Sequence, residues 1–353
     1  MTSNRSVVGF ERGKAVGNGA IILVGASSES RDDEDPLGIG SVACIEVAGR
    51  SALERMVERF EAVGITAISI LVTARNRAWL CPFRATHAGV TVQVVSDLNF
   101  GMRSEIANHN RHELEHSFVS WASAYVETDL LDLLCFHAES KQVLTHTYSD
   151  QGPLPLWVVD CAKASHAPFE NCLEDAAQAL SSRYFVREYS ICLNGPQDLR
   201  KFASDILSRR CQTDPCGEQV RPGVWIDEGA EVHRRSRIVA PAYIGCQSTI
   251  KADALITRLS DIERNCLIES GTVIEDSSVL ENTSVGICLD VCHSVASRNR
   301  LLNLERDVVV EISDSHVMKS SVAARAPLAI ESTRGIIDLR TSPMPAAWQL
   351  ENI

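Results

Sequence analysis

The sequence lacks the cysteine arrangements of disulfide scaffolds and zinc modules. It has twelve cysteines but no Cys-x-x-Cys pair. Several cysteines lie inside apolar runs, namely Cys44, Cys135, Cys161 and Cys192. Cysteines placed in this way act as small buried hydrophobic residues in a reducing compartment. We therefore expect neither a disulfide framework nor a structural zinc site.

Long apolar runs and an excess of positive charge are also missing. No stretch approaches the roughly eighteen apolar residues of a membrane span, and the N-terminus has no signal-peptide core. We therefore expect a cytoplasmic protein with no membrane partner. The net charge of −12 argues against nucleic acid as a partner. With 353 residues, 45% of them hydrophobic, the chain is long enough for two domains with their own cores.

A six-residue repeat is the strongest pattern that is present. Stepping by six from position 226 meets only aliphatic residues, and the position four further on in each hexad is always small, from Ala230 to Ser284. The aliphatic positions are Ile226, Val232, Ile238, Ile244, Ile250, Ile256, Ile262, Ile268, Ile274 and Leu280. This period predicts a parallel β-helix over 222–296, with the aliphatic residues buried and the small residues at corners. We expect the preceding domain to cover one end of the coils and residues 299–317 to cover the other.

The N-terminal half alternates between strand and helix signals. An apolar run over 20–24 ends at Gly25, and further strands are predicted over 67–72 and 90–95. Ser51 and Glu54 form a capping box for a helix that stops at Gly64. This rhythm predicts a mostly parallel sheet with helices on its faces. Ligands of such sheets bind at the carboxyl ends of strands, so the loop after Val24 is the first candidate site.

Five stretches of the chain resemble motifs of the sugar nucleotidyltransferases. They are Ile21–Ala26, Ile45–Leu53, Gly64–Ile68, Asp129–Leu134 and Tyr189–Pro196. These enzymes are the NDP-sugar pyrophosphorylases, such as the mannose-1-phosphate guanylyltransferases, and the hexads are similar to their left-handed β-helix. The resemblance implies a Rossmann-like nucleotidyltransferase domain over 15–215, a left-handed parallel β-helix of a little over three coils over 220–296, and a C-terminal extension over 297–353. It also implies a homo-oligomer assembled through the β-helix.

The residues that this chemistry needs are largely replaced. Nucleotidyl transfer depends on positioning and on neutralising the triphosphate with Mg²⁺ and basic side chains. The family's phosphate-binding lysine aligns with Val42, and its two metal-binding aspartates align with Ala124 and Cys192. In the glycine-rich turn only Gly25 remains, Arg31 lies one position late, and an acidic run follows over 32–35.

We therefore predict a catalytically degenerate member of the family, acting as a binding or regulatory subunit. It has no assigned catalytic or metal-binding residue, and Mg²⁺ is expected only if activity remains. A weak site for a sugar nucleotide, a sugar phosphate or a neutral sugar is predicted at Gly25, Ala26, Ser27 and Ser28, because small residues leave backbone N–H groups accessible. One alternative is an active sugar-1-phosphate nucleotidyltransferase with a non-standard site.

A second alternative is a hexapeptide-repeat acyltransferase with a histidine as general base. The candidates are His233 and His293, and neither has an evident carboxylate partner in the sequence. His293 also lies beside Cys288 and Cys292, but a metal site would need more ligands.

Another histidine group lies in the N-terminal half. His109, His112 and His116 are spaced for one face of a helix. We expect them to lie at a solvated helix end and not to bind zinc. Asp129 and Asp132 are read as capping and solvating the start of another helix.

Overall fold

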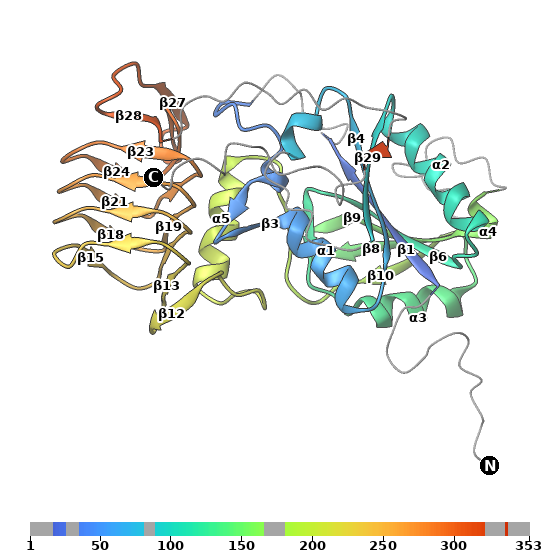
Figure 1. Cartoon of the computed structure of the whole chain (residues 1–353). Helices are drawn as coiled ribbons and strands as arrows, with labels where there is room; N and C mark the ends of the chain where they lie inside the picture. Colours follow the sequence, from blue (N-terminus) through green and yellow to red (C-terminus); the bar gives the residue numbers. More distant parts are fainter. Residues whose placement is uncertain (1–16, 26–34, 81–88, 166–180, 322–335, 338–353) are drawn as a thin grey trace, which may run out of the picture.

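The protein is a mixed α/β molecule with several sheets of parallel strands (Figure 1). A computed structural model describes residues 17–25, 35–80, 89–165, 181–321 and 336–337. Among the helices of these residues, none is long and apolar enough to cross a membrane.

The N-terminal part is built on one eight-stranded sheet. Its spatial order is β10 (Ser181–Phe185), β8 (Leu144–Ser149), β9 (Gly152–Asp160), β6 (His116–Trp121), β1 (Asn18–Val24), β4 (Ala67–Thr73), β5 (Val90–Val95) and β29 (Ile336–Ile337). The neighbours of β1 on both sides are parallel to it, whereas β9 is antiparallel to both β6 and β8. The three strands predicted from the sequence and their parallel arrangement are confirmed.

Helices cover both faces of this sheet. They are α1 (Ala52–Ala62), α2 (Leu98–Arg111), α3 (Leu130–Ser140), α4 (Cys161–Ala164) and α5 (Pro196–Leu207), with 3-10 turns η1 (Val42–Cys44) and η2 (Arg77–Leu80). The predicted capping box is confirmed, because Ser51 accepts from the Glu54 backbone N–H and the Glu54 carboxylate accepts from Ser51 N–H. Asp129 caps α3 as expected.

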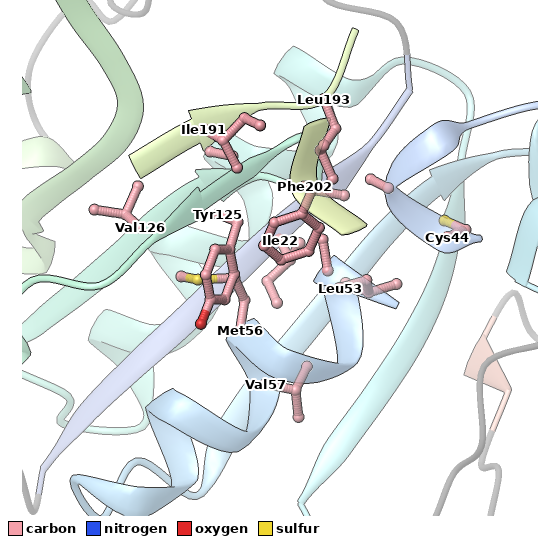
Figure 2. Packing of buried hydrophobic residues seen from close by; sticks show 14 of the residues in the cluster. Ile22, Cys44, Leu53, Met56, Val57, Tyr125, Val126, Ile191, Leu193 and Phe202 are labelled. Atoms are coloured by element: carbon pink, nitrogen blue, oxygen red, sulfur yellow. The ribbon is translucent and has the colours of Figure 1, made fainter. Parts of the chain in front are cut away.

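Alternate residues of β1 face two separate cores. Ile22 and its same-face neighbours pack against α1 and α5, whereas Ile21 and Leu23 pack against Met102 and Ile106 of α2. Figure 2 shows the first of these cores, where side chains from α1 and α5 meet those of the short strands β7 (Ala124–Val126) and β11 (Ser190–Cys192). Burial of this apolar surface is the main stabilising term for the N-terminal part.

The C-terminal part contains three further sheets that the chain visits in turn. One contains β12 (Glu218–Arg221), β13 (Val224–Ile226), β16 (Ala242–Ile244), β19 (Ser260–Ile262), β22 (Ser278–Val279), β25 (Ser294–Ser297), β26 (Arg300–Asn303) and β27 (Val308–Glu311). The second contains β14 (Glu231–Val232), β17 (Thr249–Ile250), β20 (Leu267–Ile268), β23 (Thr283–Val285) and β28 (Met318–Ser320). The third contains β15 (Arg237–Ile238), β18 (Leu255–Thr257), β21 (Val273–Glu275) and β24 (Asp290–Cys292). We call the part from β13 to β25 the three-sheet segment; within it every strand pair is parallel.

The hexad register holds only as far as Ile274. Register partners lie 18 residues apart at first, as Ile244 and Ile262 do, but Ile262 pairs with Val279 and Ile274 with Val291, which are 17 apart. One residue is therefore missing from the repeat after Ile274, and Val279 takes the inward position that the sequence assigned to Leu280. Leu280 is buried, but in the core shared with the N-terminal part. Of the other predicted aliphatic positions, those from Ile238 to Ile274 are buried, and Ile226 and Val232 are half-buried.

The flank of the three-sheet segment, and not its end, packs against the N-terminal part (Figure 1). The outward residues of its first sheet form one buried column in register. They are Trp225, Tyr243, Asp261, Ser278 and Val295. We call this contact the seam. The N-terminal part packs on this flank and not on the end of the repeat. The expectation that the preceding domain covers the end of the coils is therefore wrong.

The expectation that residues 299–317 cover the other end is confirmed for β26 and β27. Strand β26 pairs with β25 and β27 pairs with β26, both antiparallel, and β28, just beyond this range, adds to β23.

Candidate functional site

The end of β1 is tightly surrounded at Gly25. A Cβ atom at Gly25 would lie 2.7 Å from Leu98 Cδ1, 3.6 Å from Trp121 Cζ3 and 3.7 Å from Asn76 Nδ2. Only glycine fits there without movement of Leu98. The carboxyl ends of β1 and β6, the turn after β4 and the start of α2 therefore meet at one point, as the parallel sheet requires. The other predicted site residues, Ala26, Ser27 and Ser28, lie outside the described residues, as does Arg31.

The turn after β4 brings a polar side chain to this strand end. Asn76 is buried beside Gly25. The next residue, Arg77, has a buried Nη2 atom that finds no hydrogen-bond partner within the described ranges. A buried guanidinium nitrogen without a partner is costly, so its position is favourable for a ligand that accepts hydrogen bonds.

The described part of the acidic run folds onto its own loop. The Asp35 carboxylate accepts from Ile39 N–H at 3.0 Å and from Gly40 N–H at 2.7 Å. These bonds hold the turn over 35–40, and the other three acidic residues of the run lie outside the described ranges. Gly40 in turn leaves room for the Trp79 ring, since a Cβ there would lie 2.3 Å from Trp79 Cδ1.

The positions that align with the family's lysine and two aspartates carry no charge. Val42 is buried in η1. Ala124 and Cys192 are direct partners in the antiparallel pair of β7 and β11, so the structure brings these two positions together. Burial, with Asp198 nearby, raises the pKa of the Cys192 thiol and keeps it protonated. Across the described residues, no cluster of three or more His, Cys, Asp or Glu side chains could hold a metal ion.

The three histidines in the N-terminal half do not share a helical face, and this prediction is wrong. His109 lies in α2, His112 caps its end and His116 begins β6. His109 is buried, and its Nδ1 lies 2.7 Å from Ser117 Oγ while its Nε2 lies 3.6 Å from Glu105. The spacing could not reveal this, because the helix ends between His109 and His116.

The two histidines of the acyltransferase alternative differ. His233 is exposed and accepts from Arg235 N–H, with no carboxylate at its ring among the described residues. His293 Nδ1 lies 2.8 Å from Asp276 Oδ2, so it does have a carboxylate partner, one turn of the repeat earlier. Asp276 also accepts from Arg200 Nη2 at 2.8 Å, which ties the pair to α5.

A cluster of buried charge at the seam was not foreseen from the sequence. Asp261 and Glu263 flank the inward residue Ile262 and are fully buried against the N-terminal part. The Glu263 carboxylate accepts from Ala48 N–H at 2.7 Å and from Gly49 N–H at 3.1 Å. Burial raises the pKa of both carboxyl groups, and the nearby negative charges of Asp261 and Glu46 raise the pKa of Glu263 further.

Two arginines balance this negative charge. Arg200 of α5 lies 3.3 Å from Asp261, and Arg264 lies 2.6 Å from Glu46 and 2.9 Å from Glu281. The cluster therefore joins the two parts of the chain, and Asp261, Glu263 and Arg200 within it are buried. Hexads alone cannot locate it, because outward positions of a repeat carry no marker of what covers them.

No family model matches the chain, and no curated protein matches it.

Proposed function

We propose that the chain is a nucleotidyltransferase-like protein of sugar-nucleotide or polysaccharide metabolism that binds its ligand without transferring a nucleotide. In this proposal the N-terminal part is a Rossmann-like nucleotidyltransferase domain and the three-sheet segment is a left-handed parallel β-helix. Support comes from the parallel strands around β1 and from the rotation of the chain through three parallel sheets.

The observation that carries the loss of catalysis is the pairing of Ala124 with Cys192. Mg²⁺ prefers carboxylate oxygens and substrate phosphates as ligands. A methyl group and a protonated thiol offer neither, and Val42 offers no positive charge where the family has lysine. The residues present do not fit the metal, so no step of a reaction is assigned to it.

Three features support binding near the end of β1. Gly25 places no side chain there, Asn76 beside it supplies a buried amide, and Arg77, the next residue of that turn, has a guanidinium nitrogen without a partner among the described residues. Such donors suit a sugar hydroxyl or a phosphate oxygen. A sugar phosphate or an NDP-sugar carries both kinds of acceptor.

Calorimetric titration and thermal shift with UDP-glucose, GDP-mannose, glucose 1-phosphate and the four NTPs, each with and without Mg²⁺, test the proposal. We expect at least one sugar-containing ligand to bind and to raise the melting temperature, because a ligand that binds only the folded state stabilises it. We expect no pyrophosphate release. Turnover on the order of 1 per second would contradict the loss of catalysis.

Two variants locate the site, with a distant arginine as the control. We expect Arg77→Ala to weaken binding about tenfold or more, in line with the loss of a charge-assisted hydrogen bond, and Ser27→Trp to weaken it by occupying the loop. Arg237→Ala, an exposed arginine of β15, should bind normally. Binding that is indifferent to both site variants would place the ligand elsewhere.

Acyl transfer is the second candidate, favoured by the contact between His293 and Asp276. A carboxylate on Nδ1 orients an imidazole and leaves Nε2 to act as a base. Here Glu305 lies 3.8 Å from Nε2. Release of CoA from acetyl-CoA in the presence of amino sugars, abolished by His293→Ala but not by His233→Ala, would favour this function over the first.

A further inference from the structure

Strand β27 is an edge strand with an unusually apolar sequence. It is the last strand of its sheet, and within the described part of the chain no strand lies beyond it. Its residues Val308, Val309 and Val310 are 47%, 39% and 46% exposed. An exposed apolar edge with free backbone groups is a template for pairing with another strand.

Alternate residues of β27 direct their backbone groups away from β26. Ile312 N–H donates to the Asn299 carbonyl at 2.7 Å, on the β26 side. Because antiparallel hydrogen bonding alternates along a strand, Val308 and Val310 also face β26. The N–H and carbonyl groups of Val309 and Glu311 therefore point outwards.

The side chains of β27 also alternate. Val310 pairs with Leu301, which packs on the core of the three-sheet segment, as Ile312 does. Val309 pairs with Leu302, which belongs to the core shared with the N-terminal part. Val308, Val310 and Ile312 thus continue the inner apolar face beyond the last buried strand.

We propose that β27 pairs with β27 of a second copy of this chain, antiparallel, about a twofold axis through Val310. Outward-facing residues must meet outward-facing residues, so odd-numbered positions pair with odd-numbered positions. Pairing about Val310 places Val310 opposite Val310 and Val309 opposite Glu311. It places Val308 opposite Ile312, so the inner apolar faces of both copies join in one strip.

The charges select this register from its neighbours. Pairing about Val309 places Asp307 opposite Glu311, pairing about Val308 places Glu305 opposite Glu311, and pairing about Glu311 places that residue opposite itself. Like charges directly opposite each other are destabilising. Pairing about Val310 has no such opposition, and a second copy is self-complementary there, which is what a twofold contact requires. This inference does not depend on the proposed ligand site.

Sedimentation velocity over a range up to tens of micromolar tests the pairing. We expect a concentration-dependent dimer, because a single strand pair buries less surface than a permanent interface. Val310→Asp should raise the dissociation constant about tenfold or more, since it places two carboxylates opposite each other. The matched control is Val239→Asp, a valine of the third sheet's flank that is 40% exposed, which should dimerise normally.

Cysteine cross-linking tests the register. Val310→Cys should form a reducible dimer under mild oxidation, because directly opposed residues of a non-hydrogen-bonded pair lie within disulfide reach. Val309→Cys should not, because position 309 faces position 311 of the other copy. The parent chain, with its exposed Cys288, gives the background.

Three outcomes would overturn the proposal. One is a full chain that stays monomeric in sedimentation at tens of micromolar. If such a chain dimerises once residues 338–353 are removed, that segment is the occupant of the edge. Another is a dimer that Val310→Asp leaves unchanged. The third is cross-linking of Val309→Cys in place of Val310→Cys.

Discussion

Burial shifts the pKa values of two polar regions of this protein in opposite directions. In and around the central sheet, burial lowers the pKa of four histidines, which stay neutral: His109, His116, His137 and His146. At the seam, burial raises the pKa of Asp261 and Glu263. Loss of water disfavours the charged form of either kind of group, so bases lose protons and acids keep them.

The neighbours of the two groups explain how each is tolerated. His137 Nδ1 lies 2.6 Å from Thr145 Oγ1, and His109 Nδ1 lies 2.7 Å from Ser117 Oγ, so each of these neutral rings has a hydroxyl partner. The seam instead uses arginines and backbone N–H groups. The sheet histidines therefore contribute stability that is full above pH 6.5 and is lost as pH falls, whereas the seam carboxyls contribute stability that is lost as pH rises above their ordinary range. The two parts of one chain are thus held by different electrostatics.

Removing the arginine of the seam should have the largest effect. Arg200→Met leaves Asp261 buried without its cation, and we expect a loss of about 3–5 kcal/mol in the free energy of unfolding. The loss should be greater at pH 8 than at pH 5, because protonation relieves the isolated carboxylate. Urea unfolding at both pH values measures it.

The double variant Arg200→Met with Asp261→Asn serves as the control. It should recover most of the loss, because no unpaired charge is left at the seam. If the double variant is as unstable as the single one, Arg200 stabilises the seam by packing and not by its charge.

The pH response of the sheet should be smaller. Burial, with the nearby His116, lowers the pKa of His137 to about 3. Between pH 6.5 and pH 5 its protonation in the unfolded chain should cost about 2 kcal/mol of folding stability. His137→Asn, which can still bond Thr145, should flatten this part of the curve of unfolding free energy against pH. Exposed His233→Gln should leave the slope as it is, and a slope unchanged by both would show that His137 is not its source.

The sequence predicted much of the fold because local patterns decide it. The apolar run ending at Gly25, the capping box at Ser51 and the hexads up to Ile274 each reflect a short-range rule that the structure obeys. The one-residue deletion after Ile274 was missed because Leu280 and Ser278 satisfy the old register by chance.

The seam and the site could be predicted only in part. The sequence named Ala124 and Cys192 as positions of one site, and they are indeed strand partners. It could not name Asp261, Glu263 or Arg200, because their meeting depends on which flank of a repeat is covered. Burial against a distant part of the chain leaves no periodic signal.

A smaller change in the sheet, Gly19→Ala, tests whether close packing against β1 fixes the position of the His109 ring. A Cβ at Gly19 of β1 would lie 2.6 Å from His109 Cε1, so Gly19→Ala should displace the ring from Ser117. We expect a loss of about 1–3 kcal/mol in the free energy of unfolding, as for other overpacked cores. The same substitution should cost less in a His109→Ala background, because the contact is then absent. Equal costs in the two backgrounds would mean that the ring does not restrict this position.

The smallest effect should come from an arginine and aspartate pair outside the seam. Arg235 and Asp253 form an ion pair on the three-sheet segment, with side chains 63% and 51% exposed. Both ions keep most of their hydration, and salt screens their attraction, so Arg235→Met should cost less than about 0.5 kcal/mol in the free energy of unfolding. The same substitution at Arg200 should cost several times more, although the two pairs share their chemistry. Urea unfolding of both variants in low and high salt separates the two cases, because only the exposed pair should weaken as salt rises. If the two substitutions cost the same, burial of the ion pair is not what distinguishes the seam, and its stability must come from its apolar residues Trp225, Tyr243 and Val295.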